Sequence, residues 1–196
     1  MDRALSAAHG NYPASLAGCS LAYRLVYCMR NPLRIYCARY LAIVPRPRGG
    51  DWLEDEVQAW QHAGLDMVVS LLMPDEVANF DLGQEKAWCQ ARGIDFVAFP
   101  IPDRGVPSSW HATLALAHKL GQALAEEKRI AVHCRQGIGR SALLAACVLM
   151  AADEEPETAF EHISAARGRA VPEMTEQQAW VKACPLAPSA PFCGKL

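Results

Sequence analysis

Residues 133 to 141 read His133-Cys134-Arg135-Gln136-Gly137-Ile138-Gly139-Arg140-Ser141, and this nonapeptide is the most informative stretch of the sequence. The short apolar segment that precedes it, residues 130–132, is typical of a buried strand. The alanine-rich apolar run that follows it, residues 142–151, predicts a buried helix. The nonapeptide therefore lies on a loop that joins a strand to a helix.

The composition of this loop predicts a site for an anion. Gly137 and Gly139 permit the positive φ values with which backbone N–H groups curl around a phosphate. The helix that begins near Arg140 adds the positive end of its dipole. The planar guanidinium of Arg140 can grip two phosphoryl oxygens at once, which a lysine cannot do. The expected phosphate-binding residues are Arg135, Gln136, Gly137, Ile138, Gly139 and Arg140.

Cys134 is the predicted nucleophile of this loop. Helix N-termini, converging amides and a nearby guanidinium each favour a thiolate over a thiol, and a thiolate can attack phosphorus. Ser141 is placed to donate a hydrogen bond to the sulfur and so to ease its departure from a phosphocysteine. His133 is expected to order the loop rather than to act as a base. The competing interpretation is that Cys134 is only a buried cysteine at a strand end.

The pattern His-Cys, five residues, Arg and Ser resembles the signature of the cysteine-dependent protein tyrosine phosphatase superfamily. The resemblance covers residues 33–184 and is closest to the compact dual-specificity branch. It implies a hydrolase that cleaves phosphomonoesters through a phosphocysteine intermediate, with no metal and no cofactor. A rhodanese-like sulfurtransferase also uses a cysteine on an anion-binding loop, but its loop has four residues between Cys and Arg.

A second segment, the proline-bracketed loop of residues 99–107, contains the carboxylate Asp103, 31 residues before Cys134. An Asp in such a position is by itself typical of a turn. In dual-specificity phosphatases the general acid lies on a loop about thirty residues before the nucleophile, so the resemblance assigns that role to Asp103. A carboxylic acid there protonates the leaving oxygen and later activates water. Glu126 and Glu127 lie beside Lys128 and Arg129 and are interpreted as solvated surface charges.

Residues 165–181 resemble the segment that closes this fold, in which an arginine-rich turn precedes a final helix. Thr175 is predicted to be the N-cap of that helix. Gln177 has two open interpretations. It could orient the hydrolytic water, as a glutamine does in some relatives, or it could be an exposed residue in the first turn of the helix.

Strands and helices alternate along the chain, which predicts an α/β fold with a central, mostly parallel sheet of four to five strands flanked by helices. The expected strands are residues 40–44, 67–71, 94–99 and 130–134. The expected helices between them are residues 53–62, 84–91 and 109–126. The loop after Cys134 then lies at the carboxyl end of a central strand, where open α/β sheets bind their ligands.

Charge divides the chain into parts. Residues 1–50 carry seven arginines and one aspartate, whereas residues 51–196 carry 12 basic and 20 acidic residues. We therefore expect a basic N-terminal extension (1–32), a catalytic domain (33–184) and a proline-rich C-terminal tail (185–196). No run of 18 uncharged apolar residues occurs, so stable membrane insertion is not expected.

The expected partner is a phosphorylated protein, with phosphotyrosine favoured, and no nucleic acid; the chain is expected to be a monomer. The cysteines form no C-x-x-C pair, and the need for a reduced Cys134 indicates a cytoplasmic protein. Two alternatives stay open. The substrate could be an inositide or an RNA 5′ phosphate, since one sequence does not give the depth of the pocket. The domain could also bind phosphoproteins without turnover.

Overall fold

The structure is a computed structural model that describes residues 40–184. The predicted N-terminal extension (1–32) and C-terminal tail (185–196) lie outside the described residues. The strands are β1 (Leu41–Pro45), β2 (Met67–Ser70), β3 (Asp95–Ala98) and β4 (Ile130–Cys134). The helices are η2 (Gly50–Trp52), α1 (Leu53–His62), α2 (Pro74–Asn79), α3 (Glu85–Ala91), α4 (Trp110–Ala125), α5 (Arg140–Met150), α6 (Pro156–Arg167) and α7 (Thr175–Lys182).

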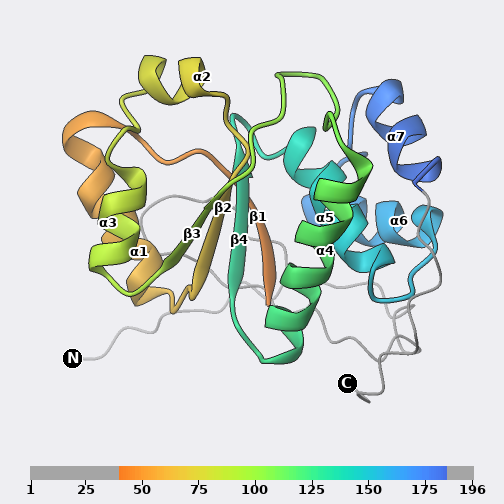
Figure 1. Ribbon diagram of the computed structural model, residues 1–196, viewed down its shortest axis with the longest axis horizontal. Coiled ribbons are helices and arrows are strands. Elements are labelled where there is room, and N and C mark those ends of the chain that lie inside the picture. The colour runs from red at the N-terminus through yellow and green to blue at the C-terminus, as the bar shows by residue number, and fades with distance from the viewer. Residues whose placement is uncertain (1–39, 185–196) are drawn as a thin grey trace, which may run out of the picture.

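The four strands form one parallel sheet in the order β1-β4-β2-β3. β4 is therefore central, and its last residue, Cys134, pairs with Pro45 of β1. Since all strands are parallel, their carboxyl ends meet at one edge, where Figure 1 also shows α2. Connections that follow the strands reach the same edge, and this brings distant parts of the chain together.

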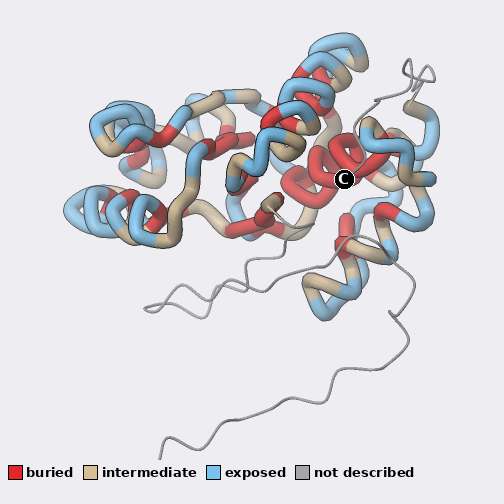
Figure 2. The backbone as a smooth tube through the Cα atoms, turned by 90° about the horizontal axis from the view of Figure 1, so that it is seen from below, coloured by how far each residue is buried: buried red, intermediate tan, exposed pale blue. Residues whose placement is uncertain are grey.

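Helices cover both faces of the sheet (Figure 1). On one face, α1 and α3 pack with Leu53, Val57 and Cys89 against strand residues such as Val68 and Ala131. On the other face, α4 to α7 enclose a larger core that includes Val132 and all apolar residues of α5. α5 is buried along its whole length (Figure 2), because β4 and three helices surround it. The helix that follows the loop of residues 135–139 is thus the most enclosed helix of the described chain.

The expected α/β fold with a parallel sheet is confirmed, with four strands in the described residues. The predicted strand at residues 130–134 and helix at residues 53–62 have the observed bounds. The helix predicted at residues 142–151 begins two residues too late, and the other predicted strands and helices agree within one residue at each end. Thr175 as N-cap was wrong: Met174 is the N-cap, in extended conformation, and Thr175 is already helical. No helix in residues 40–184 is long and apolar enough to cross a bilayer.

Candidate active site

The loop between β4 and α5 folds back toward the sulfur of Cys134. The Gly137 N–H points at Cys134 Sγ at 3.3 Å, a donor that favours negative charge on the sulfur. Gly137 has a φ of +66°, and a Cβ there would lie 2.8 Å from the carbonyl carbon of Val44. Glycine is therefore required at this position both by conformation and by space. The sequence-based prediction of a curled loop at Gly137 agrees with this geometry.

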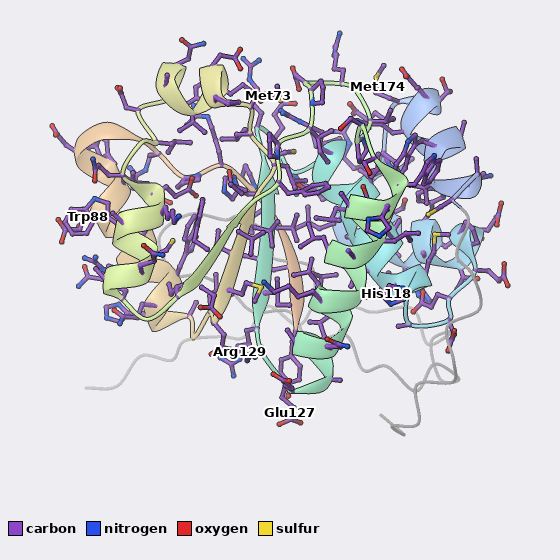
Figure 3. The ribbon with its side chains drawn as sticks, viewed as in Figure 1. Met73, Trp88, His118, Glu127, Arg129 and Met174 are labelled. Carbon is purple, nitrogen blue, oxygen red and sulfur yellow. The ribbon has the colours of Figure 1, made fainter. Side chains whose placement is uncertain are left out.

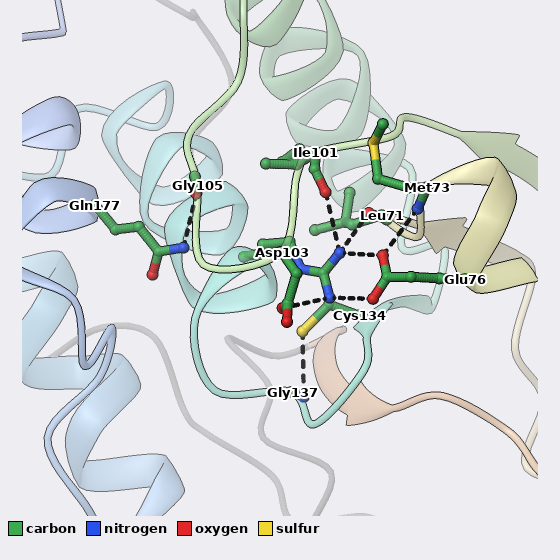
Figure 4. A network of polar contacts seen from close by, with 10 residues as sticks. Leu71, Met73, Glu76, Ile101, Asp103, Gly105, Cys134, Gly137 and Gln177 are labelled. Carbon is green, nitrogen blue, oxygen red and sulfur yellow. Dashed lines mark hydrogen bonds and ion pairs between the residues drawn. The ribbon is translucent and has the colours of Figure 1, made fainter. Parts of the chain in front are cut away.

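Arg140, the first residue of α5, is held by a network of acceptors (Figure 4). It is only 2% exposed. Its Nη1 donates to Glu76 Oε2 at 2.6 Å and to the carbonyls of Ile101 and Leu71 at 3.0 and 3.4 Å. Its Nη2 donates to Glu76 Oε1 at 2.8 Å and to Asp103 Oδ1 at 2.9 Å. The guanidinium is thus fixed in position before any ligand arrives.

Glu76 is the residue of the site that sequence reasoning missed. Burial by itself raises the pKa of the Glu76 carboxyl, but hydrogen bonds from Arg140 and from the Met73 N–H, with the charges of Arg140 and Arg135, hold that pKa below its usual value. Burial likewise opposes the charge of Arg140, but the hydrogen bond to Glu76 and electrostatic attraction toward Cys134, Glu76 and Asp103 raise the pKa of Arg140. The two side chains therefore form a charged bidentate pair. A signal existed in the sequence: Glu76 lies just after β2, whose end meets the same edge of the sheet as Cys134.

Asp103 lies on the loop between β3 and α4, as predicted, and reaches the same guanidinium. Its side chain is half exposed, at 49%, on the solvent side of Arg140. The next residue, Arg104, has a φ of +58°, a conformation that non-glycine residues seldom adopt, and it marks the turn that aims Asp103 inward. The structure thus brings together three predicted site residues from two segments of the chain: Cys134 and Arg140 at the two ends of one loop, and Asp103 on another.

These side chains line a pocket of about 430 Å³ at the carboxyl edge of the sheet. Met73 and Met174 lie at this end of the molecule, whereas Arg129 and Glu127 lie at the opposite end (Figure 3). The pocket is lined by Asp103, Arg104, Cys134, Arg135, Gln136, Ile138, Gly139, Arg140, Glu173, Met174 and Gln177. All predicted phosphate-binding residues except Gly137 are among them. Within residues 40–184, no cluster of His, Cys, Asp or Glu could hold a metal ion.

A family model described as "Polymorphic toxin system, DSP-PTPase phosphatase" matches residues 44–154, more than half of the chain. The chain belongs to this family. It is a cysteine-dependent phosphatase of the protein tyrosine and dual-specificity class, as the nonapeptide predicted. Cyclin-dependent kinase inhibitor 3 from Rattus norvegicus is 25% identical to it over 146 residues, which are 69% of this chain and 66% of that protein. The match thus spans slightly less than two thirds of that relative.

Solved structures share the fold of this phosphatase. Kinase associated phosphatase (KAP), with its catalytic cysteine replaced by serine, has a TM-score of 0.68 and 20% identity, over 78% of this chain and 93% of that one. Tk-PTP in its active form has a TM-score of 0.60 and 25% identity, over 72% and 88%. P. aeruginosa TpbA in complex with pTyr has a TM-score of 0.58 and 19% identity, over 85% and 91%. The described sheet and helices are therefore those of the dual-specificity phosphatases.

Gln177 of the phosphatase is fully buried, and this excludes the interpretation of an exposed first-turn residue. Its Nε2 donates to the Gly105 carbonyl at 2.8 Å, so it ties α7 to the loop of Asp103. Its Oε1 is buried and has no hydrogen-bond partner among residues 40–184, and a Cβ on Gly139 would come within 2.8 Å of it. A free acceptor at this position faces the catalytic loop. The interpretation that Gln177 orients the hydrolytic water stays a prediction.

His133 and Ser141 occupy buried positions next to the loop. The His133 ring lies on the face of the sheet opposite to Cys134, near Trp60, and its Nε2 is 2.8 Å from Glu85 Oε1. His133 can therefore act on the loop only through the end of β4. The Ser141 hydroxyl is buried and makes no hydrogen bond to any described residue, so the expected bond to Cys134 Sγ is not formed here. Its role stays a prediction.

Arg167, at the end of α6, is a second residue whose role the sequence did not predict. Its Nε donates to the Gly137 carbonyl and its Nη2 to the Gln136 carbonyl, each at 3.1 Å. These bonds turn the two carbonyls of the loop outward. The N–H groups of the same peptides, those of Gly137 and Ile138, then lie on the side away from Arg167, where the Gly137 N–H points at Cys134 Sγ. The sequence placed Arg167 in an arginine-rich turn, but nothing local connects that turn with residues 30 positions earlier.

Proposed function

We propose that the phosphatase hydrolyses phosphotyrosine in proteins through a phosphocysteine intermediate on Cys134. One observation carries this proposal: Cys134, Arg140 and Asp103 converge on one pocket, with Arg140 and Asp103 only 2.9 Å apart. A nucleophile, a fixed cation and an acid are the three groups that such a transfer requires. The roles given to individual residues below belong to the same proposal.

In the first step, the phosphoryl group binds between the loop N–H groups and the guanidinium of Arg140. The Cys134 thiolate attacks phosphorus, and the S–P bond forms as the bond to the leaving oxygen breaks. Arg140 and the loop amides hold the three equatorial oxygens, over which the charge of the transferring group is spread in the transition state. Glu76 keeps Arg140 in the orientation that this requires, and Arg167 supports the loop.

Asp103 is the proposed general acid of the first step and the general base of the second. It gives its proton to the leaving phenolate, and as a carboxylate it then takes a proton from the water that attacks the phosphocysteine. Gln177 supports the second step, because its buried, unpartnered Oε1 can accept a hydrogen bond from that water. Ser141 would donate to the departing sulfur after a rotation of its hydroxyl. Both steps need only these protein groups, the substrate and water.

The preference for phosphotyrosine rests on the shape of the site. Cys134 is 3% exposed at the base of a pocket of about 430 Å³, and a long phenolic side chain reaches such a base more easily than a short serine does. Among proteins of the same fold, P. aeruginosa TpbA has been solved in complex with pTyr. We propose further that the enzyme acts as a monomer in the cytoplasm, where a thiolate nucleophile stays reduced.

Hydrolysis of p-nitrophenyl phosphate in the presence of EDTA tests the mechanism. The proposal expects turnover in the wild type, none in Cys134→Ser, and in Asp103→Asn a loss of rate for phenol esters with poor leaving groups between about pH 5 and 8. Asp75→Asn is the matched control, since Asp75 is an exposed carboxylate in α2 that makes no contact with the site. Wild-type enzyme that is trapped during turnover should carry labelled phosphorus from the substrate in a bond that amine nucleophiles do not cleave. The absence of this label from Cys134→Ser identifies the intermediate as phosphocysteine. Full activity in Cys134→Ser would overturn the proposal.

A further inference from the structure

Two arginines next to the catalytic pocket share one aromatic ring. The guanidinium carbon of Arg46 lies 4.0 Å from the centroid of Phe80, and that of Arg135 lies 5.5 Å from it. Arg46 directly follows β1 and Arg135 directly follows β4, two neighbouring strands whose last residues pair with each other. The Arg46 N–H also donates to the Arg135 carbonyl at 3.4 Å. We call Arg46, Phe80 and Arg135 the rim site.

Neither guanidinium of the rim site forms an ion pair with residues 40–184. The Arg135 side chain is exposed and makes no hydrogen bond there, although its charge acts on Glu76, and the Arg46 guanidinium donates only to the neighbouring Pro47 carbonyl. Arg48 pairs with Glu56, Arg92 with Glu54 and Arg169 with Glu173. The rim site differs from these three arginines, because no carboxylate of residues 40–184 pairs with either of its guanidinium groups.

Such an arrangement is organised for an anion. The shared ring places the two guanidinium groups within about 10 Å of each other, which is comparable with the ~8 Å Debye length at physiological ionic strength, so each charge is felt by the other. Contact with Phe80 fixes both groups, and their mutual repulsion falls when an anion lies between or beside them. An acidic ligand thus gains attraction without having to order either side chain.

The rim site adjoins the catalytic pocket through Arg135, which lines that pocket directly after Cys134. A ligand whose phosphate reaches Cys134 therefore carries its neighbouring groups past the rim site. In an extended peptide, successive residues advance by about 3.3 Å, so the residues one or two positions from the phosphotyrosine lie about 3 to 7 Å along the chain from it, at the rim of the pocket. The half-buried Phe80 ring offers the flat apolar wall that a peptide side chain can cover.

We propose that the rim site binds a second negative charge of the substrate, so that the phosphatase prefers phosphotyrosine peptides with an acidic or phosphorylated residue one or two positions away. The inference rests on the proposed phosphotyrosine activity and names the substrate class of that site. The Arg46 side chain makes no hydrogen bond or ion pair with Cys134, Arg140 or Asp103, and its contact with the loop is the bond from its backbone N–H to the Arg135 carbonyl, which Arg46→Gln keeps. It is therefore a specificity residue whose contribution depends on the charge of the peptide.

The test compares two phosphotyrosine peptides that differ only in Glu or Gln at the flanking positions, each with wild type, Arg46→Gln and Arg48→Gln. Arg48 is the matched control, since it is an arginine two residues further on that stacks on Trp52 at 4.5 Å and already pairs with Glu56. We expect wild type and Arg48→Gln to show a kcat/KM about five to ten times higher for the Glu peptide, an advantage of about 1.0 to 1.4 kcal/mol. Arg46→Gln should lose this advantage and keep its kcat/KM for the Gln peptide and for p-nitrophenyl phosphate.

The alternatives give different results. Equal kcat/KM for both peptides in the wild type, or an advantage that Arg104→Gln abolishes and Arg46→Gln preserves, would overturn the rim site. A soluble short-chain inositide bisphosphate whose hydrolysis depends on Arg46 more than that of the Glu peptide would overturn the peptide assignment. An enzyme without turnover of p-nitrophenyl phosphate would refute the proposed function itself, so the two failures are distinguishable.

Discussion

Glu76→Gln separates the charge of the Glu76–Arg140 pair from its shape. Glu76 Oε2 accepts from both Arg140 Nη1 and the Met73 N–H, while Oε1 accepts only from Arg140 Nη2. A glutamine whose oxygen takes the position of Oε2 keeps the bond to Met73 and one bond to Arg140. Its amide NH₂ then faces the N–H of Nη2, and one charge-assisted hydrogen bond becomes a repulsive contact. The substitution therefore leaves the beginning of α2 intact but frees Arg140 on one side.

The size of the effect follows from the remaining partners of Arg140. Breaking a buried ion pair costs about 3–5 kcal/mol when it leaves an uncompensated charge. Arg140 keeps Asp103 and two carbonyls, so we expect a loss of about 1–3 kcal/mol in the free energy of unfolding. In the transition state, a misaligned guanidinium loses about one charge-assisted hydrogen bond to the phosphoryl group. This corresponds to a fall in kcat/KM of about 10- to 100-fold.

The assay combines the kcat/KM for p-nitrophenyl phosphate, inhibition by vanadate and a urea unfolding curve. Vanadate has the geometry of the transferring phosphoryl group, so its inhibition should weaken in parallel with kcat/KM. Asp75→Asn, one residue earlier in the same helix turn, should leave all three quantities unchanged. The reasoning is refuted by a Glu76→Gln enzyme that is destabilised as expected but retains wild-type kcat/KM and vanadate inhibition. In that case Glu76 supports the fold without positioning Arg140.

Three further predictions concern the loop, the water site and pH. Gly137→Ala places a methyl group 2.8 Å from Val44 in a conformation with φ of +66°, so activity should fall at least about 100-fold and the free energy of unfolding by about 2–4 kcal/mol. The control Gly121→Ala, in the middle of α4 where a Cβ meets open space, should stabilise the protein by about 0.5–1 kcal/mol. A fully active Gly137→Ala enzyme would contradict this prediction. Gln177→Leu should keep the initial burst of p-nitrophenol, which reports the first step, and slow the steady-state rate, which includes hydrolysis of the phosphocysteine. The control is Gln178→Ala, since the Gln178 amide bonds the Pro172 carbonyl, and it should leave the steady-state rate unchanged. Loss of the burst itself in Gln177→Leu would place Gln177 in the first step. The pKa of Glu76 lies below its usual 4.5 in the folded protein, so the stabilisation from the ionised carboxylate is complete above pH 4.5 and is lost as the pH falls through the lower folded value. The free energy of unfolding from urea curves should therefore fall more steeply in acid for wild type than for Glu76→Gln. Equal falls in the two proteins would contradict a charged Glu76–Arg140 pair.

The sequence predicted the parts of the site that lie close together along the chain. Cys134, the loop glycines and Arg140 lie within seven consecutive residues, so loop closure alone brings them together. Asp103 was assignable only through the resemblance to a known family, because a lone aspartate in a turn has no distinguishing pattern. The strands β2 and β4 were predicted from their apolar composition, since both are covered by helices on two faces.

Sequence reasoning failed where a role depends on contacts between distant segments. Glu76 is 64 positions from Arg140, and its helix α2 has six residues, too few for a helical period to be visible. α6 was not predicted, because only Ala159 and Ile163 are buried on it and its apolar pattern is weak. Arg167 at its end therefore had no predicted neighbour. For Gln177, the burial of the side chain chose between the two interpretations. This burial follows from the packing of α7, and the polar sequence of the first turn of that helix does not reveal it.

The partners of Arg140 link phosphate binding to the placement of the general acid. Nη1 and Nη2 carry four N–H groups, and Glu76, Ile101, Leu71 and Asp103 accept from them in this structure, while Nε bonds none of residues 40–184. A phosphoryl group that takes two bonds from Arg140 can use Nε, but its second bond must replace one of these acceptors. Asp103 is the most exposed of the side-chain partners, at 49% against 12% for Glu76, and its loop is the one that can yield. In the proposed mechanism, the substrate therefore displaces the Asp103 carboxyl from Arg140 toward the leaving oxygen, where this carboxyl acts as the general acid.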